Sequence, residues 1–136
     1  MCFPARKWLS DLPRGPVRPI GREVEYVHGS PADEDEYIFF REDACAALHA
    51  NRAWITFCGH MHWQVGWSLN GDELTPLKPD FESKAEIDQF DLLLRRSNRY
   101  FLNPGSIGEP REGDWRAAFA IFDDAQSLLS WYRVPY

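Results

Sequence analysis

The chain has 136 residues, 44% of them hydrophobic and 15% aromatic, which is enough to form the core of one domain and excludes intrinsic disorder. A formal net charge of -6 argues against a basic surface for nucleic acid, and three scattered cysteines exclude a disulfide framework. No apolar run is long enough to span a membrane, and the first 15 residues lack the apolar core of a signal peptide. We therefore expect a cytoplasmic protein with no nucleic-acid partner and no membrane partner.

The first 20 residues are expected to form an extended, proline-rich lead-in. Four prolines and four basic residues occur there, and prolines at this density remove backbone donors and break helices. The segment Ala5–Asp11 has room for one short helix before Pro13. Arg22–Val27 follows with the alternation of a short strand and leads into the loop His28-Gly29-Ser30-Pro31.

The next segment is predicted to be helical and then to enter a buried strand. The acidic run Asp33–Glu36 suits a short, solvated helical turn, because carboxylates favour the N-terminal end of the helix dipole. Glu42–Ala50 is expected to be a helix. Ala53–Cys58 is an apolar run of strand-forming residues, as in a strand buried on both faces.

The second half predicts mostly antiparallel structure. Asn70-Gly71-Asp72 separates two strand-like runs and is a strong hairpin signal. Phe81–Asn98 has apolar residues at a helix-like spacing. A short strand, a glycine- and proline-rich loop and two further strands complete the chain, over Arg99–Leu102, Asn103–Asp114, Trp115–Phe122 and Ser127–Val134. The order predicts a mixed α/β chain, with residues 1–136 forming a single domain.

The sharpest chemical feature is Gly59-His60-Met61-His62, directly after the predicted buried strand. Residues i and i+2 of an extended segment point to the same side, so His60 and His62 are placed to bind metal ions. Two imidazoles can each reach one ion of a pair about 3.5–4 Å apart. The alternative is that both are exposed polar loop residues. Cys58 is either a soft ligand beside them or a small buried strand residue, and the second is favoured.

His28 also follows a predicted strand, so its position repeats that of His60. Parallel strands deliver side chains to one edge of a sheet, and we expect His28, His60 and His62 to converge there. His28 alone would be a structural residue. His49, in the polar end of a helix, is expected to be solvated and outside the group.

The loop Asn103–Arg111 is either a backbone anion site or a rigid structural loop in which Asn103 binds nearby backbone. The structural interpretation is favoured. Arg111 can meet a phosphate with two parallel hydrogen bonds, although a salt-bridged surface arginine is the favoured interpretation.

Three motifs in order resemble those of the small calcineurin-like metallophosphoesterases. They are Val27-His28-Gly29-Ser30-Pro31, Gly59-His60-Met61-His62 and the run Asn103–Asp114, and the likeness extends over nearly the whole chain. Met61 stands where the family usually has threonine, and Gln64 and Trp115 stand where it often has proline.

The resemblance implies the C-terminal portion of a four-layer α-β-β-α sandwich, with a mixed sheet and antiparallel hairpins. It implies that His28 and His60 bind one metal and that His62 binds the other. It also implies two divalent ions per complete site, which activate water against a phosphate-ester small molecule. Mn, Zn, Fe, Ni and Mg are not distinguished by the sequence.

The family's Asp-x-His and Gly-Asn-His motifs are absent, and the two Gly-Asp pairs lie after the histidine motif. We therefore expect an incomplete phosphoesterase site with little activity in this chain. Alternatives are a non-catalytic interaction module of the same fold and a truncated gene product. A half-sandwich also predicts self-association or capture by a complementing N-terminal segment.

Overall fold

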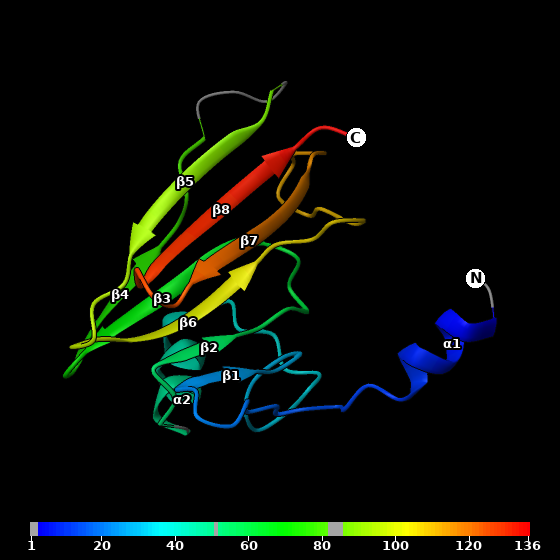
Figure 1. Ribbon diagram of the computed structural model, residues 1–136. Coiled ribbons are helices and arrows are strands. Elements are labelled where there is room, and N and C mark those ends of the chain that lie inside the picture. The colour runs from blue at the N-terminus through cyan, green and yellow to red at the C-terminus, as the bar shows by residue number, and fades with distance from the viewer. Residues whose placement is uncertain (1–2, 51, 82–85) are drawn as a thin grey trace.

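The computed structural model describes residues 3–50, 52–81 and 86–136, and these form two β-sheets with a helix on the outer side of one of them (Figure 1). The five-stranded sheet has the order β1-β2-β6-β3-β4, and the three-stranded sheet has the order β5-β8-β7. The helices are α1 (Phe3–Ser10) and α2 (Arg41–Ala50). The strands are β1 (Val24–Tyr26), β2 (Ile55–Phe57), β3 (Gln64–Asn70), β4 (Glu73–Leu77), β5 (Asp88–Leu93), β6 (Arg99–Pro104), β7 (Ala117–Asp123) and β8 (Leu128–Val134).

Three layers result, each joined to the next by an apolar core. One buried cluster lies between α2 and the five-stranded sheet and includes Leu48, Met61 and Phe101. The other fills the space between the two sheets and includes Ile55 and Trp131. This α-β-β arrangement agrees with part of the expected four-layer sandwich, and the mixed sheet with antiparallel hairpins is confirmed.

Strands β1, β2 and β6 are parallel neighbours, with β2 in the middle. Both flanks of the strand in the run Ala53–Cys58 are paired, because β1 and β6 lie on its two sides. Ile55 and Thr56 are fully buried, as an apolar run in a parallel sheet requires. The open edge belongs instead to β1, whose outer side carries only the bridge between Val17 and Tyr26 among the described residues.

The predicted hairpin is confirmed as β3 and β4, with Gly71 at a positive φ of 58° in the turn. The strands expected near the C-terminus are confirmed as β7 and β8. Gln64 ties the two sheets together, because its side-chain amide donates to the carbonyls of Phe119 and Tyr132 at 3.1 and 2.9 Å.

The helix predicted within Phe81–Asn98 is wrong for the described part, which contains strand β5. Its side chains alternate along the strand, and Phe90 and Leu92 face the core between the sheets, whereas Leu93 is 67% exposed. Pairing with β8 satisfies the backbone of this strand. Residues 82–85 of the predicted helix lie outside the described residues.

The helical turn predicted at Asp33–Glu36 is also wrong. Side-chain oxygens there capture backbone donors and replace the helical pattern: Ser30 Oγ accepts from the amides of Ala32 and Asp33, and Asp33 Oδ1 accepts from the amide of Asp35. The resulting turn wraps around Gly29, where a Cβ would lie 2.6 Å from the carbonyl oxygen of Glu34.

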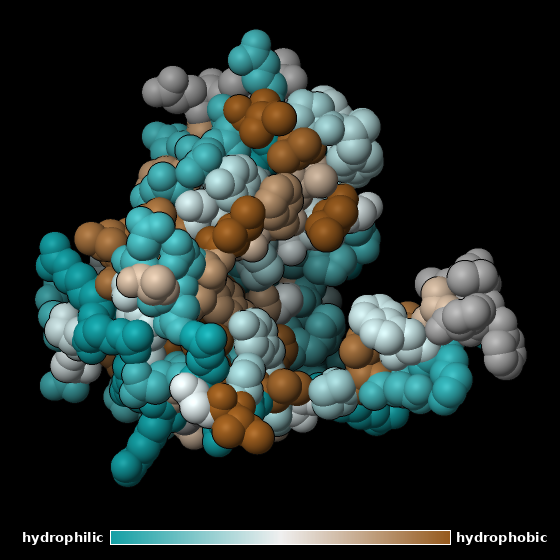
Figure 2. Space-filling view, viewed as in Figure 1, coloured by the Kyte–Doolittle hydropathy of each residue, from teal (hydrophilic) through white to brown (hydrophobic). Residues whose placement is uncertain are grey.

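The lead-in begins with α1, which projects away from the sheets (Figures 1 and 2). Its Trp8 is 64% exposed and its Leu9 is 51% exposed. Neither described helix is long and apolar enough to cross a bilayer.

Candidate metal centre

His28 and His60 meet at one edge of the five-stranded sheet. Each lies just beyond the end of a strand, and because β1 and β2 are parallel neighbours, both strands deliver their histidine to the same edge. The Nδ1 atom of His60 lies 3.1 Å from the Nε2 atom of His28, and the ring centroids are 4.8 Å apart. The backbone amide of Gly59 also donates to the carbonyl of His28 at 2.8 Å. The expected meeting of these two side chains is therefore present.

The loop that carries His60 and His62 has an unusual backbone. Their φ angles are 59° and 63°, in the left-handed region that residues other than glycine seldom adopt. Met61 between them is buried in the core beneath α2 and anchors the loop. Asn103 holds its start, because the side-chain amide donates to the carbonyl of Gly59 at 2.6 Å. These contacts hold His60 and His62 in the left-handed conformation. Residues in such strained conformations are found most often at functional sites of proteins.

The ring of His60 is half-buried beneath an aromatic side chain. The centroid of Tyr37 lies 3.9 Å from that of His60. The Nε2 atom of His60 is buried and has no hydrogen-bond partner among the described residues. A buried polar atom without a partner costs about 1–3 kcal/mol, so this nitrogen is suited to a ligand that accepts its lone pair.

His62 is oriented by the loop that follows β6. Its Nδ1 atom lies 2.9 Å from the carbonyl oxygen of Glu109, and the Glu109 carboxylate is 3.6 Å from the same nitrogen. Because a carbonyl oxygen only accepts, Nδ1 carries the proton and Nε2 keeps its lone pair. Metal-binding histidines are commonly fixed in this way.

The three histidines do not form one compact ligand group. No cluster of three or more His, Cys, Asp or Glu side chains at metal-binding distance occurs among residues 3–50, 52–81 and 86–136. His28 and His60 therefore fit as two ligands of one ion, and His62 is held separately.

Cys58 and His49 are not part of the site. Burial raises the pKa of the Cys58 thiol well above its ordinary value, and its Sγ atom lies 3.6 Å from the carbonyl of Leu102. His49 is exposed on α2 and its Nδ1 atom lies 2.7 Å from the carbonyl of Cys45. Both expectations, a buried strand cysteine and a solvated helix histidine, are confirmed.

The loop after β6 acts as a support. Asn103 Oδ1 accepts from the amide of Gly105 at 2.9 Å, and Ser106 Oγ accepts from the amide of Glu109 at 2.9 Å. These backbone donors are therefore already engaged, which favours the structural interpretation of the loop. Arg111 forms the expected salt bridge, 3.4 Å from Glu109, and hydrogen bonding with Tyr37 is the main cause that raises its pKa.

Sequence reasoning missed Tyr37 and Glu109. Tyr37 stood in the sequence only as part of an aromatic run after acidic residues, and its packing on His60 depends on how the Asp33–Glu36 turn folds back. Glu109 contributes its carbonyl to His62, a role that the backbone of any residue can perform. No side-chain signal could have identified it.

Comparisons with known proteins show similarity in sequence and in fold. No protein-family model matches the chain. An uncharacterized protein of Methanocaldococcus jannaschii is 30% identical over 135 residues, covering 96% of this chain and 49% of that protein. The crystal structure of a metallophosphoesterase from Sphaerobacter thermophilus matches with a TM-score of 0.78 and 32% identity, over 100% of this chain and 52% of that one.

The chain therefore spans about half the length of each of these two proteins. The two sheets and the likeness to the solved structure show that the chain has the fold of the C-terminal part of a metallophosphoesterase.

Proposed function

We propose that this chain supplies histidine ligands to a divalent-metal site that serves the hydrolysis of phosphate esters, either monoesters or diesters. The observation that carries the proposal is the pairing of His28 and His60 at 3.1 Å, with the buried Nε2 atom of His60 left unpartnered. Divalent ions in such a site supply positive charge to phosphate oxygens and activate water.

The residues of the chain have separate roles in this proposal. His28 and His60 would hold one ion, because their facing nitrogens lie 3.1 Å apart. His62 presents its Nε2 atom towards a second ion, because Glu109 fixes the proton on Nδ1. Tyr37 covers one side of His60 and limits the access of water to that ring.

Activity of the chain alone is expected to be weak. A zinc site needs at least three protein ligands, and a pair of ions needs a bridging carboxylate to offset their repulsion. Two histidines meet here, and no carboxylate joins them among the described residues. The remaining ligands would come from elsewhere, such as a complementing N-terminal segment.

The test is hydrolysis of a chromogenic phosphodiester with added Mn²⁺, comparing the parent chain with His60→Ala and with His49→Ala as a matched control. We expect slow, chelator-sensitive turnover that His60→Ala abolishes and His49→Ala leaves unchanged. Turnover that survives both the chelator and His60→Ala would contradict the proposal. Fast turnover abolished by both would mean that this chain supplies a full ligand set, with Asp33 and Asp35 the first candidates because they closely follow His28.

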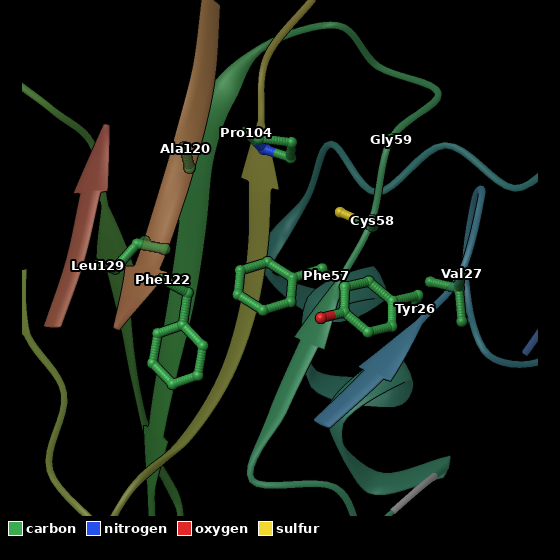
Figure 3. Close-up of a pocket in the computed structure, with 9 residues that line it drawn as sticks. All are labelled: Tyr26, Val27, Phe57, Cys58, Gly59, Pro104, Ala120, Phe122 and Leu129. Carbon is green, nitrogen blue, oxygen red and sulfur yellow. The ribbon is translucent and has the colours of Figure 1, made fainter. Parts of the chain in front are cut away.

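A second candidate function is a non-catalytic interaction module, and a specific cleft favours it. The cleft, of about 410 Å³, opens between the two sheets and is lined by residues of β1, β2, β6, β7 and β8 (Figure 3). The rings of Tyr26, Phe57 and Phe122 lie along it, with Tyr26 46% exposed and stacked on Phe57 at 5.6 Å. Strand β7 pairs only with β8 among the described strands and so presents an open edge beside this cleft, whereas Val17 bridges Tyr26 on the outer side of β1.

Open strand edges beside apolar rings favour pairing with another chain. We propose self-association or a complementing segment as the occupant. Sedimentation at several concentrations separates the possibilities: a concentration-dependent dimer supports self-association, whereas a compact monomer with a sharp, concentration-independent thermal transition contradicts both.

A further inference from the structure

A second cavity, separate from the cleft between the two sheets, has a volume of about 550 Å³ and is the larger of the two. Its lining includes Trp63, which directly follows His62, and Arg111 from the loop after β6. Lys78, Phe81 and Arg133 complete this part of the lining. Of these five residues, only Arg111 was considered as a ligand-binding residue from the sequence.

The lining carries charges of both signs, with four cationic residues and three acidic ones. Arg116 is neutralised by Asp114 at 2.6 Å and by Asp88 at 2.8 Å. Two exposed cations line the cavity: Lys78, and Arg111, which is paired with Glu109 at 3.4 Å.

Arg133 is the informative residue. Its side chain is 2% exposed, its Nη2 atom forms an ion pair with Glu112 at 2.7 Å, and its Nη1 atom donates to the carbonyl of Asp114 at 3.5 Å. Its Nε atom is buried and has no hydrogen-bond partner among the described residues. A charged donor that is buried and unpartnered is unfavourable, and an anionic oxygen satisfies it more strongly than a neutral one does.

The walls beside this donor are aromatic. The guanidinium of Arg133 lies 5.9 Å from the ring centroid of Phe81, and Trp63, also in the lining, is 38% exposed. Flat rings stack on such side chains, and an arginine near a ring can still donate in its plane through an unbonded nitrogen, here Nε.

We propose that this cavity binds a small organic anion that carries a planar ring, with its anionic oxygens on Arg133 and its ring against Trp63 or Phe81. The acidic group is a phosphate or a carboxylate, since both present the oxygens that a guanidinium recognises. The proposal concerns this cavity alone and holds whether or not His28 and His60 bind a metal.

The experiment is calorimetric titration in the presence of a chelator, which removes any contribution of metal at the histidines. Three probes separate the two parts of the ligand: adenosine 5′-monophosphate carries ring and anion, adenosine carries the ring alone, and inorganic phosphate carries the anion alone. A fourth probe, benzoate, distinguishes a carboxylate from a phosphate. We expect the nucleotide or benzoate to bind at least about tenfold more tightly than adenosine or phosphate, because a charge-assisted bond and a stacked ring act together.

Variants locate the binding. Arg133→Lys keeps the charge but removes the Nε donor, and should weaken binding by about tenfold. Since that buried change can also disturb folding, the exposed rim variants Lys78→Gln and Arg111→Gln provide a second reading, each weakening binding by about two- to fivefold. Arg22→Gln, far along the chain at another surface, is the matched control and should bind as the parent does. Equal binding by the rim variants and the parent, or no preference for a ring-bearing anion, overturns the proposal.

Discussion

Asn103→Ala should destabilise the protein and loosen the histidine loop together. Asn103 is 1% exposed, donates to the carbonyl of Gly59 at 2.6 Å and accepts from the amide of Gly105 at 2.9 Å. Removing its amide leaves both backbone groups without these partners. At about 1–3 kcal/mol for each buried group left unsatisfied, the loss is about 2–6 kcal/mol, against a typical total of about 5–15 kcal/mol.

The assay is urea unfolding of Asn103→Ala beside Asn98→Ala, a matched change at a half-buried asparagine that donates to Ser68 Oγ at 2.8 Å. The control should lose no more than about 1 kcal/mol, because water can replace its bonds to the hydroxyls of Ser68 and Ser97. The same samples should show larger changes in the imidazole NMR signals of His60 for Asn103→Ala than for Asn98→Ala. Equal destabilisation by the two variants would refute the reasoning that Asn103 holds this loop.

Three further outcomes follow from the packing and the charges. Gly66→Ala should cost about 1–3 kcal/mol, because the added Cβ would lie 2.6 Å from a side chain of β6, whereas Gly108→Ala, with nothing within 4 Å, should be near neutral in the same denaturation assay. The hydrogen bond from Arg116 lowers the pKa of Asp114 below its ordinary value of 3.8. The Asp114 carboxylate therefore stabilises the fold above that pH, and its contribution is lost as the pH falls through the lowered pKa. Asp114→Asn should make the free energy of unfolding depend less on pH across that acidic range. Because burial raises the pKa of Cys58, its thiol should resist iodoacetamide in the folded protein and react after unfolding, as measured by mass spectrometry.

The sequence predicted those elements whose signals are local. Asn70-Gly71 fixes a hairpin turn within a few residues, and the apolar run Ala53–Cys58 reads as a buried strand from its own composition. Within Phe81–Asn98 the spacing of the apolar residues wrongly indicated a helix. Ile87 and Leu93 are each 67% exposed and do not share a face with Phe90. The segment instead alternates as a strand, and it does so because it pairs with β8, a partner distant in the sequence.

The candidate site was likewise predictable only in part from the sequence. His28 and His60 follow strands, and parallel pairing brings strand ends together, so their meeting could be inferred from the sequence. The cover that Tyr37 places on His60 and the bond from His62 to Glu109 could not, because both depend on where distant loops fold back. The unpartnered nitrogens of His60 and Arg133 are likewise properties of packing alone.

Metal binding by the histidine pair tests the central claim most directly. Equilibrium dialysis against Zn²⁺ and Mn²⁺ would compare the parent chain with His28→Ala, His60→Ala and the control His49→Ala. We predict weak binding of one ion, lost in the first two variants and retained in the third. Binding that is unchanged by His28→Ala and His60→Ala, or no binding by the parent chain at all, would contradict the assignment of this pair as metal ligands.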